Sequence, residues 1–239
     1  MNHRRLFITT ATAGLLGSSI VLGLPVASAH SSNGEGQKKT VELTASLHEL
    51  NDSGASGTAS AVVRKQLIRS IEVEADGLSP DAPHAMHIHY GDDARNECPT
   101  MEMDAASTRT DGTLRLSTAD GLPAYGPIVV SLTTTGDTTP EVSALAVDRF
   151  PTSSDGELDY SRKNIKFTDV AGTGYPGVNG TGTAKQIADA IRDGEGVVVI
   201  HGVDYNHNGE YDFESAGKSE LDSSLPAEAT DPAACGVLR

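Results

Sequence analysis

The chain has 239 residues, with 33 Asp and Glu against 18 Lys and Arg, which gives a formal net charge of −15 at pH 7. This excess of negative charge argues against nucleic acid and anionic membrane surfaces as partners. The length is sufficient for one domain with a well-packed core.

The N-terminus has the features of an export signal. Arg4 and Arg5 precede an apolar stretch over 6–26, and Ala27-Ser28-Ala29 has the small side chains of a cleavage site. The sequence therefore predicts a signal peptide over residues 1–29, with export by the general secretory route or, given the paired arginines, the twin-arginine route. No later stretch is apolar enough to span a membrane, so we expect a secreted or cell-envelope protein.

The residues that follow predict a flexible leader and then a β-domain. Residues 30–39 are polar and contain glycine. Apolar and polar residues then alternate from Val41 to Leu47, and Asn51 to Gly54 supplies a turn. Further short strands are expected at 59–63, 68–75, 113–117, 128–132 and 197–201. Such a series predicts an all-β antiparallel sandwich or barrel, which we expect to form a single domain over 40–239.

A change of composition interrupts this pattern at about 133–195, where Thr, Gly, Asp and Pro are frequent. We interpret this region as a long insertion lying on the sandwich. It carries one predicted short helix, over 184–192, with Ile187, Ala188 and Ile191 on one face and Gly194 as its stop.

The segment from His84 to His89 contains three of the eight histidines of the chain. In a strand, His87 and His89 project from the same face, about 6.6–7 Å apart along the backbone, so both rings can reach one metal ion. Imidazole ligands suit copper and zinc. The alternative is a polar pair that faces solvent or is satisfied by hydrogen bonds.

Two further features extend this pattern. The apolar strand 197–201 ends in His201, and the chain has two cysteines, Cys98 and Cys235. In an exported protein the oxidising compartment favours a disulfide over two free thiols.

The combination of motifs resembles the copper/zinc superoxide dismutases. That family has a His-x-x-His-x-His strand before Gly-Asp, a Val-Val-His strand, and an Ala-Cys-Gly-Val C-terminus. Here these motifs stand at 84–89 with Gly91-Asp92, at 198–201 and at 234–237. The resemblance covers about 40–98 and 197–238 and implies a Greek-key β-sandwich of the superoxide dismutase type. The strand at 126–132 also looks like that of chordin-type domains.

Carried over to this chain, the resemblance implies that His87, His89 and His201 are copper ligands. His84 would support the site by packing and hydrogen bonding, and Cys98 would pair with Cys235 to anchor the loop after the histidine strand.

The departures from the family are equally specific. The chain has no histidine from Cys98 to Ile200, so the family's zinc site and bridging histidine are missing. Pro232 stands where the family has an arginine that attracts superoxide. Water, Tyr90, Met101, Met103 and His207 are the alternatives for a further copper ligand, although ordinary packing also explains the two methionines.

A second set of oxygen-bearing side chains follows His201. Asp204, Asn206, Asn208 and Asp212, with Gly209 in sixth place, match the start of a calcium loop, but Ser215 replaces the bidentate glutamate of the twelfth position. The alternative is a turn in which these side chains bind their own backbone.

Three functions are consistent with the sequence. The first is an exported copper-binding protein of superoxide dismutase-like fold whose dismutase activity is weak or lost. The second is an active copper-only dismutase that acts on superoxide, and the third is a non-catalytic structural module of chordin type. The sequence assigns no catalytic residue and leaves the oligomeric state open.

Overall fold

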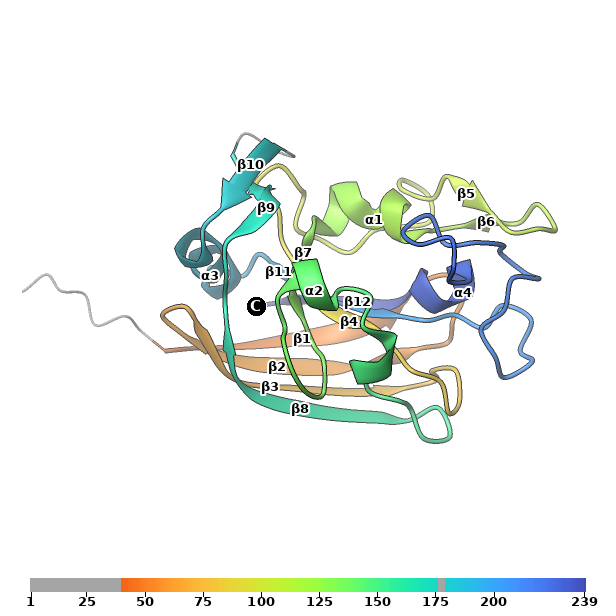
Figure 1. Ribbon diagram of the computed structural model, residues 1–239, viewed down its shortest axis with the longest axis horizontal. Coiled ribbons are helices and arrows are strands. Elements are labelled where there is room, and N and C mark those ends of the chain that lie inside the picture. Colours follow the sequence, from red (N-terminus) through yellow and green to blue (C-terminus); the bar gives the residue numbers. More distant parts are fainter. Residues whose placement is uncertain (1–39, 176–178) are drawn as a thin grey trace, which may run out of the picture. The chain divides into compact units, whose positions relative to one another are not determined.

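Eight strands form one antiparallel sheet. The structure, a computed structural model, describes residues 40–175 and 179–239. The strand order is β7-β4-β11-β12-β1-β2-β3-β8 (Figure 1). The strands are β1 (Val41–Glu49), β2 (Ser56–Arg64), β3 (Leu67–Asp76), β4 (Met86–His89), β7 (Ile128–Ser131), β8 (Leu158–Lys166), β11 (Gly196–His201) and β12 (Pro232–Leu238). The mainly β class predicted from the alternating pattern is confirmed.

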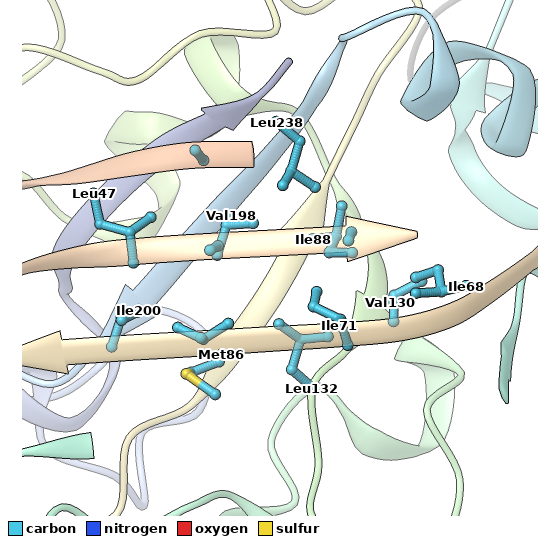
Figure 2. Close-up of a cluster of buried hydrophobic side chains, with 14 of the residues drawn as sticks. Leu47, Ile68, Ile71, Met86, Ile88, Val130, Leu132, Val198, Ile200 and Leu238 are labelled. Atoms are coloured by element: carbon cyan, nitrogen blue, oxygen red, sulfur yellow. The ribbon is translucent and has the colours of Figure 1, made fainter. Parts of the chain in front are cut away.

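The sheet curls into a half-barrel at β1. This strand pairs with β2 over 41–47, but it pairs with β12 only at His48 and Glu49, near its end. The two halves of the sheet therefore face each other across one apolar core. Leu47, Ile68 and Ile71 come from one half, and they pack in the same cluster as Met86, Ile88, Val198 and Ile200 from the other (Figure 2).

The outer face of β4 and β11 is also covered. Val198 and Ile200 belong to the main core, whereas Val197 and Val199 pack on the opposite side with Leu116, Tyr125 and Cys235. A strand buried on both faces needs apolar residues at successive positions, which explains the uninterrupted Val-Val-Val-Ile run. His87, His89 and His201 lie on this outer, covered face, because side chains alternate along each strand.

The predicted helix at 184–192 is confirmed as α3 (Ala184–Arg192). Thr183 caps its N-terminus in a reciprocal arrangement with Gln186, and Ile187, Ala188 and Ile191 are buried. The expectation of a single short helix is nevertheless wrong, because the described residues also form α1 (Thr118–Tyr125), α2 (Pro140–Ser143) and α4 (Ala227–Thr230). Helix α1 is not expected from the sequence because Gly121 and Pro123 have low helix propensity. The cap at Ser117 and the burial of Tyr125 stabilise this helix.

The region 133–195 is not wholly an insertion. Its strand β8 pairs with β3 and forms an edge of the main sheet. The buried positions of β8 do not alternate strictly, because Ile165 follows Leu158 and Tyr160 out of step. Asn164 between them has a positive φ of 59°. The alternation that would predict this strand from the sequence is therefore incomplete. The rest of the region includes the two-stranded β9 (Val170–Gly174) and β10 (Gly180–Gly182).

The remaining expectations concern the ends and the loops. The expected strand at 113–117 is reduced to β6 (Leu114–Arg115), which pairs with β5 (Ser107–Thr108). The predicted signal peptide, 1–29, and leader, 30–39, lie outside the described residues. None of the described helices has the length and apolar character needed to cross a membrane.

Candidate metal centre

Three histidines from two neighbouring strands converge on the covered face of the sheet. β4 pairs antiparallel with β11, and His87 lies opposite Val199. His201, two residues further along β11, therefore projects from the same face as His87 and His89. One nitrogen atom from each ring lies within 4.8 Å of the other two. The predicted grouping of His87, His89 and His201 is thus confirmed as geometry.

Each of these rings is oriented by a main-chain carbonyl. The Nε2 atom of His87 lies 3.1 Å from the oxygen of Ala144, while Nδ1 of His89 and of His201 lie 2.7 Å from the oxygens of Gly126 and Thr230. A carbonyl only accepts hydrogen bonds, so in each ring this nitrogen carries the proton. The other nitrogen then holds a lone pair.

The three lone-pair nitrogens are Nδ1 of His87, Nε2 of His89 and Nε2 of His201. All three are buried and have no hydrogen-bond partner. A buried polar atom without a partner is costly, and three of them in one histidine cluster make this a possible metal site. Histidine ligands whose second nitrogen binds a carbonyl are typical of metal sites.

Burial keeps the rings neutral. It lowers the pKa of His89 to about 3 and that of His201 to about 4, and the pKa of His87 is lowered well below its usual value. The side chains of Phe150 and Tyr125 contribute to this environment, with ring centroids 5.3 Å from His87 and 4.4 Å from His89. A neutral imidazole is the form that binds a metal ion.

The predicted disulfide is confirmed. Cys98, in the loop after β4, is bonded to Cys235 of β12, with 5.7 Å between their Cα atoms. Cys235 packs with Val199 and Tyr125 on the face that carries the histidines. A disulfide is typical of proteins in an oxidising, extracellular environment.

His84 supports the end of β11 without joining the three-histidine cluster. It is fully buried, and its Nδ1 lies 2.9 Å from the main-chain oxygen of His201, while its Nε2 lies 3.1 Å from that of Ser79. A supporting role of His84 at a metal site stays a prediction.

The residues considered as further ligands are dispersed. Tyr90 packs in the main core, on the other side of β4 from His89. Met103 is 67% exposed, and Met101 packs beside the cluster that contains the disulfide. His207 is exposed in the loop after β11. A fourth ligand from this group stays a prediction.

The loop after β11 binds its own backbone. The carboxylate of Asp204 accepts hydrogen bonds from the backbone of Asn208 and Gly209, and the side chains of Asn206 and Asn208 donate to Asp212. Buried Glu228 accepts from the backbone of Tyr205 and Asp212 and so fixes the loop from α4. Calcium binding by Asp204, Asn206, Asn208 and Asp212 stays a prediction.

Several parts of the site carry no sequence signal. The carbonyl groups of Gly126, Ala144 and Thr230 are backbone atoms, which no motif identifies. Ser131 lies opposite His87 in β7, and its buried hydroxyl has no partner. Arg115 and Asp231 form a buried ion pair next to Thr230. Their separation of more than a hundred residues hides this pairing from the sequence.

The fold and the site define a mostly β protein with a curled eight-stranded antiparallel sheet and a buried cluster of three histidines. No family model matches the chain, and comparison with curated proteins finds no similar sequence. The three-histidine site is therefore the feature that bears on function.

Proposed function

We propose that this chain is an exported copper-binding protein of superoxide dismutase-like fold, with weak or lost dismutase activity. The observation that carries the proposal is the cluster of His87, His89 and His201, in which one nitrogen atom of each ring lies within 4.8 Å of the others and each ring has one buried nitrogen without a partner. The rings are neutral and held in place by carbonyl groups, so little reorganisation is needed for binding.

Copper is favoured by the donor set and by the resemblance of the surrounding motifs. Imidazole nitrogens bind both Cu(II) and Zn(II), and copper stands above zinc in the general order of affinity. When bound, copper would supply a centre that changes between two oxidation states. The chain's own part is to orient the three rings, to keep them deprotonated and to exclude water with Tyr125 and Phe150.

Weak or lost dismutase activity is supported by the charges near the site. The arginine of the family pattern is replaced by Pro232. Arg115 lies in the same part of the fold, but both oxygens of Asp231 bind its guanidinium, at 2.6 and 2.7 Å. Its charge is thereby neutralised for an approaching anion.

Two other functions are distinguished by experiment. An active copper-only dismutase would need only the metal as catalyst, and it predicts that the loaded protein removes superoxide faster than free copper in the same buffer. A structural module of chordin type predicts no dependence of the melting temperature on metal.

The test is copper titration of the oxidised protein, together with elemental analysis. We expect one copper ion per chain, a rise in melting temperature and loss of binding in His87→Ala and His89→Ala. The matched control is His48→Ala, because His48 is an exposed histidine of β1.

Two results would contradict the proposal. One is a folded protein that takes up no stoichiometric copper. The other is unchanged affinity in the His87→Ala and His89→Ala variants. In the first case, stoichiometric zinc in place of copper would retain the metal site but overturn the metal assignment.

A further inference from the structure

A pocket of about 620 Å³ at the surface reaches His89 of the histidine cluster. It is bounded by residues of α1, β7, the start of α2 and the start of β9, and by Leu221 in the loop before α4. His89 forms part of its wall. The pocket thus extends from the outside of the domain to one residue of the three-histidine cluster.

His89, which lines the pocket, has one ring nitrogen without a partner. The Nε2 atom of His89 has no hydrogen-bond partner, and the residue is only 1% exposed. Nδ1 is already bonded to Gly126, so the free nitrogen is the one available to a ligand that arrives through the pocket. His89 is therefore the residue at which the pocket meets the candidate metal site.

The charges of the pocket have one sign. Glu141 and Asp169 line it, and no lysine or arginine is among the described residues of its wall. Glu220 adds a third carboxylate nearby, because it accepts a hydrogen bond from Ala119, the neighbour of the lining residue Thr118. Arg149, which is close in sequence to Glu141, does not line the pocket, and its guanidinium donates to the main-chain oxygens of Asp137 and Val142.

The rest of the wall is largely apolar, including Leu122, Pro127, Ile128 and Leu221. Low-dielectric walls strengthen the field of charges that line a cleft, and the local concentration of counter-ions rises accordingly. Two carboxylates in such a pocket attract a cation and repel an anion.

We propose that this pocket is the path by which the metal cation reaches His89, and that Glu141 and Asp169 capture the hydrated ion on the way. The inference rests on the proposed function and deepens it, since it assigns the access to the site to a cation. Superoxide and other small anions are disfavoured on the same path by the same carboxylates.

The test is the rate of copper uptake. Metal-free oxidised protein is mixed with Cu(II) chloride at low ionic strength, and quenching of tyrosine fluorescence is followed. Tyr125 reports on the site, because its ring centroid lies 4.4 Å from that of His89. The double variant Glu141→Gln/Asp169→Asn is compared with the wild type. The Asp169→Asn change keeps a side-chain oxygen that can accept from the backbone of Ala184, as the carboxylate of Asp169 does.

The matched control is Glu74→Gln/Asp159→Asn. These two residues are exposed and lie opposite each other in β3 and β8, and the control removes the same charge without touching the pocket. We expect uptake by the pocket variant to be slower by about threefold or more, and the control to keep the wild-type rate. The difference should shrink at about 0.5 M salt, where charges are screened within a few ångströms. The final copper content should be one ion per chain in all three proteins.

Equal uptake rates in the pocket variant and the control, with full copper content, would overturn the path and leave the proposed function intact. A fall of the same size in both variants would also overturn it, because the effect would then come from net charge alone. Absence of copper from the wild type would overturn the proposed function and this inference together.

Discussion

His89 donates a hydrogen bond from Nδ1 to the main-chain oxygen of Gly126, 2.7 Å away. Gly126 has φ 81° and ψ 179°, a conformation that is essentially restricted to glycine. A β-carbon at this position would lie 2.6 Å from the backbone nitrogen of Gly91 and the carbonyl carbon of Tyr90. The backbone conformation that places this carbonyl group against His89 therefore requires a glycine at position 126.

Replacement of Gly126 by alanine should disturb both folding and metal binding. We expect Gly126→Ala to lower the free energy of unfolding by about 1–3 kcal/mol, because the backbone conformation is strained for alanine. Displacement of the carbonyl should also weaken copper binding about tenfold or more. Urea denaturation and copper titration measure the two effects. Gly112→Ala is the control, because Gly112 has φ 87° and no atom near its missing β-carbon. Equal copper affinity in the two variants would refute the role of Gly126.

Acid should destabilise the metal-free protein. An unfolded histidine has a pKa of about 6.5, whereas burial lowers the pKa of His89 to about 3 and that of His201 to about 4. At pH values between the folded and unfolded pKa values, these histidines bind more protons in the unfolded chain than in the folded protein. The free energy of unfolding therefore falls as the pH falls from about 6.5 to about 4. Each ring contributes up to about 1.4 kcal/mol per pH unit.

Urea denaturation from about pH 7.5 to about pH 4.5 measures this dependence. His89→Leu should show a shallower slope than the wild type, and His48→Leu, at an exposed position, is the control. Bound copper should add stability that disappears over the same interval, because protons compete for the ring nitrogens. A metal-free protein with constant stability from about pH 7.5 to about pH 5 would contradict the expectation.

The sequence predicts those parts of the site that depend on strand periodicity. Alternation places His87 and His89 on one face, and the apolar run before His201 indicates a buried strand. It cannot show that β4 and β11 are neighbours, because that depends on pairing over more than a hundred residues. The carbonyl groups of Ala144 and Thr230, which orient His87 and His201, cannot be predicted from the sequence for the same reason. Helix α1 is not predicted because Gly121 and Pro123 have low helix propensity. It forms because the tertiary packing of Tyr125 outweighs this low propensity.

The disulfide should make a large contribution to stability. Cys98 and Cys235 are 137 residues apart, and closing a loop of this length lowers the entropy of the unfolded chain by an amount worth about 5 kcal/mol. We expect Cys98→Ala/Cys235→Ala to lose about 2–5 kcal/mol of unfolding free energy. Wild type treated with a reductant should match this variant, and the variant itself should be insensitive to the reductant. An identical denaturation midpoint for oxidised and reduced wild type would contradict the prediction.

Removal of Arg115 alone should lower the free energy of unfolding more than removal of both Arg115 and Asp231. Arg115 is 6% exposed and Asp231 is fully buried, and the hydroxyl of Tyr205 also donates to Asp231, at 2.8 Å. Arg115→Met leaves the carboxylate without its cation in a buried site, and we expect a loss of about 3–5 kcal/mol. Arg115→Met/Asp231→Leu removes both charges and should regain much of that loss. Urea denaturation of the wild type, both single variants and the double variant gives the coupling energy. No unpaired charge remains in the double variant. If it is no more stable than Arg115→Met, the loss of stability in Arg115→Met arises from packing, and the prediction is contradicted.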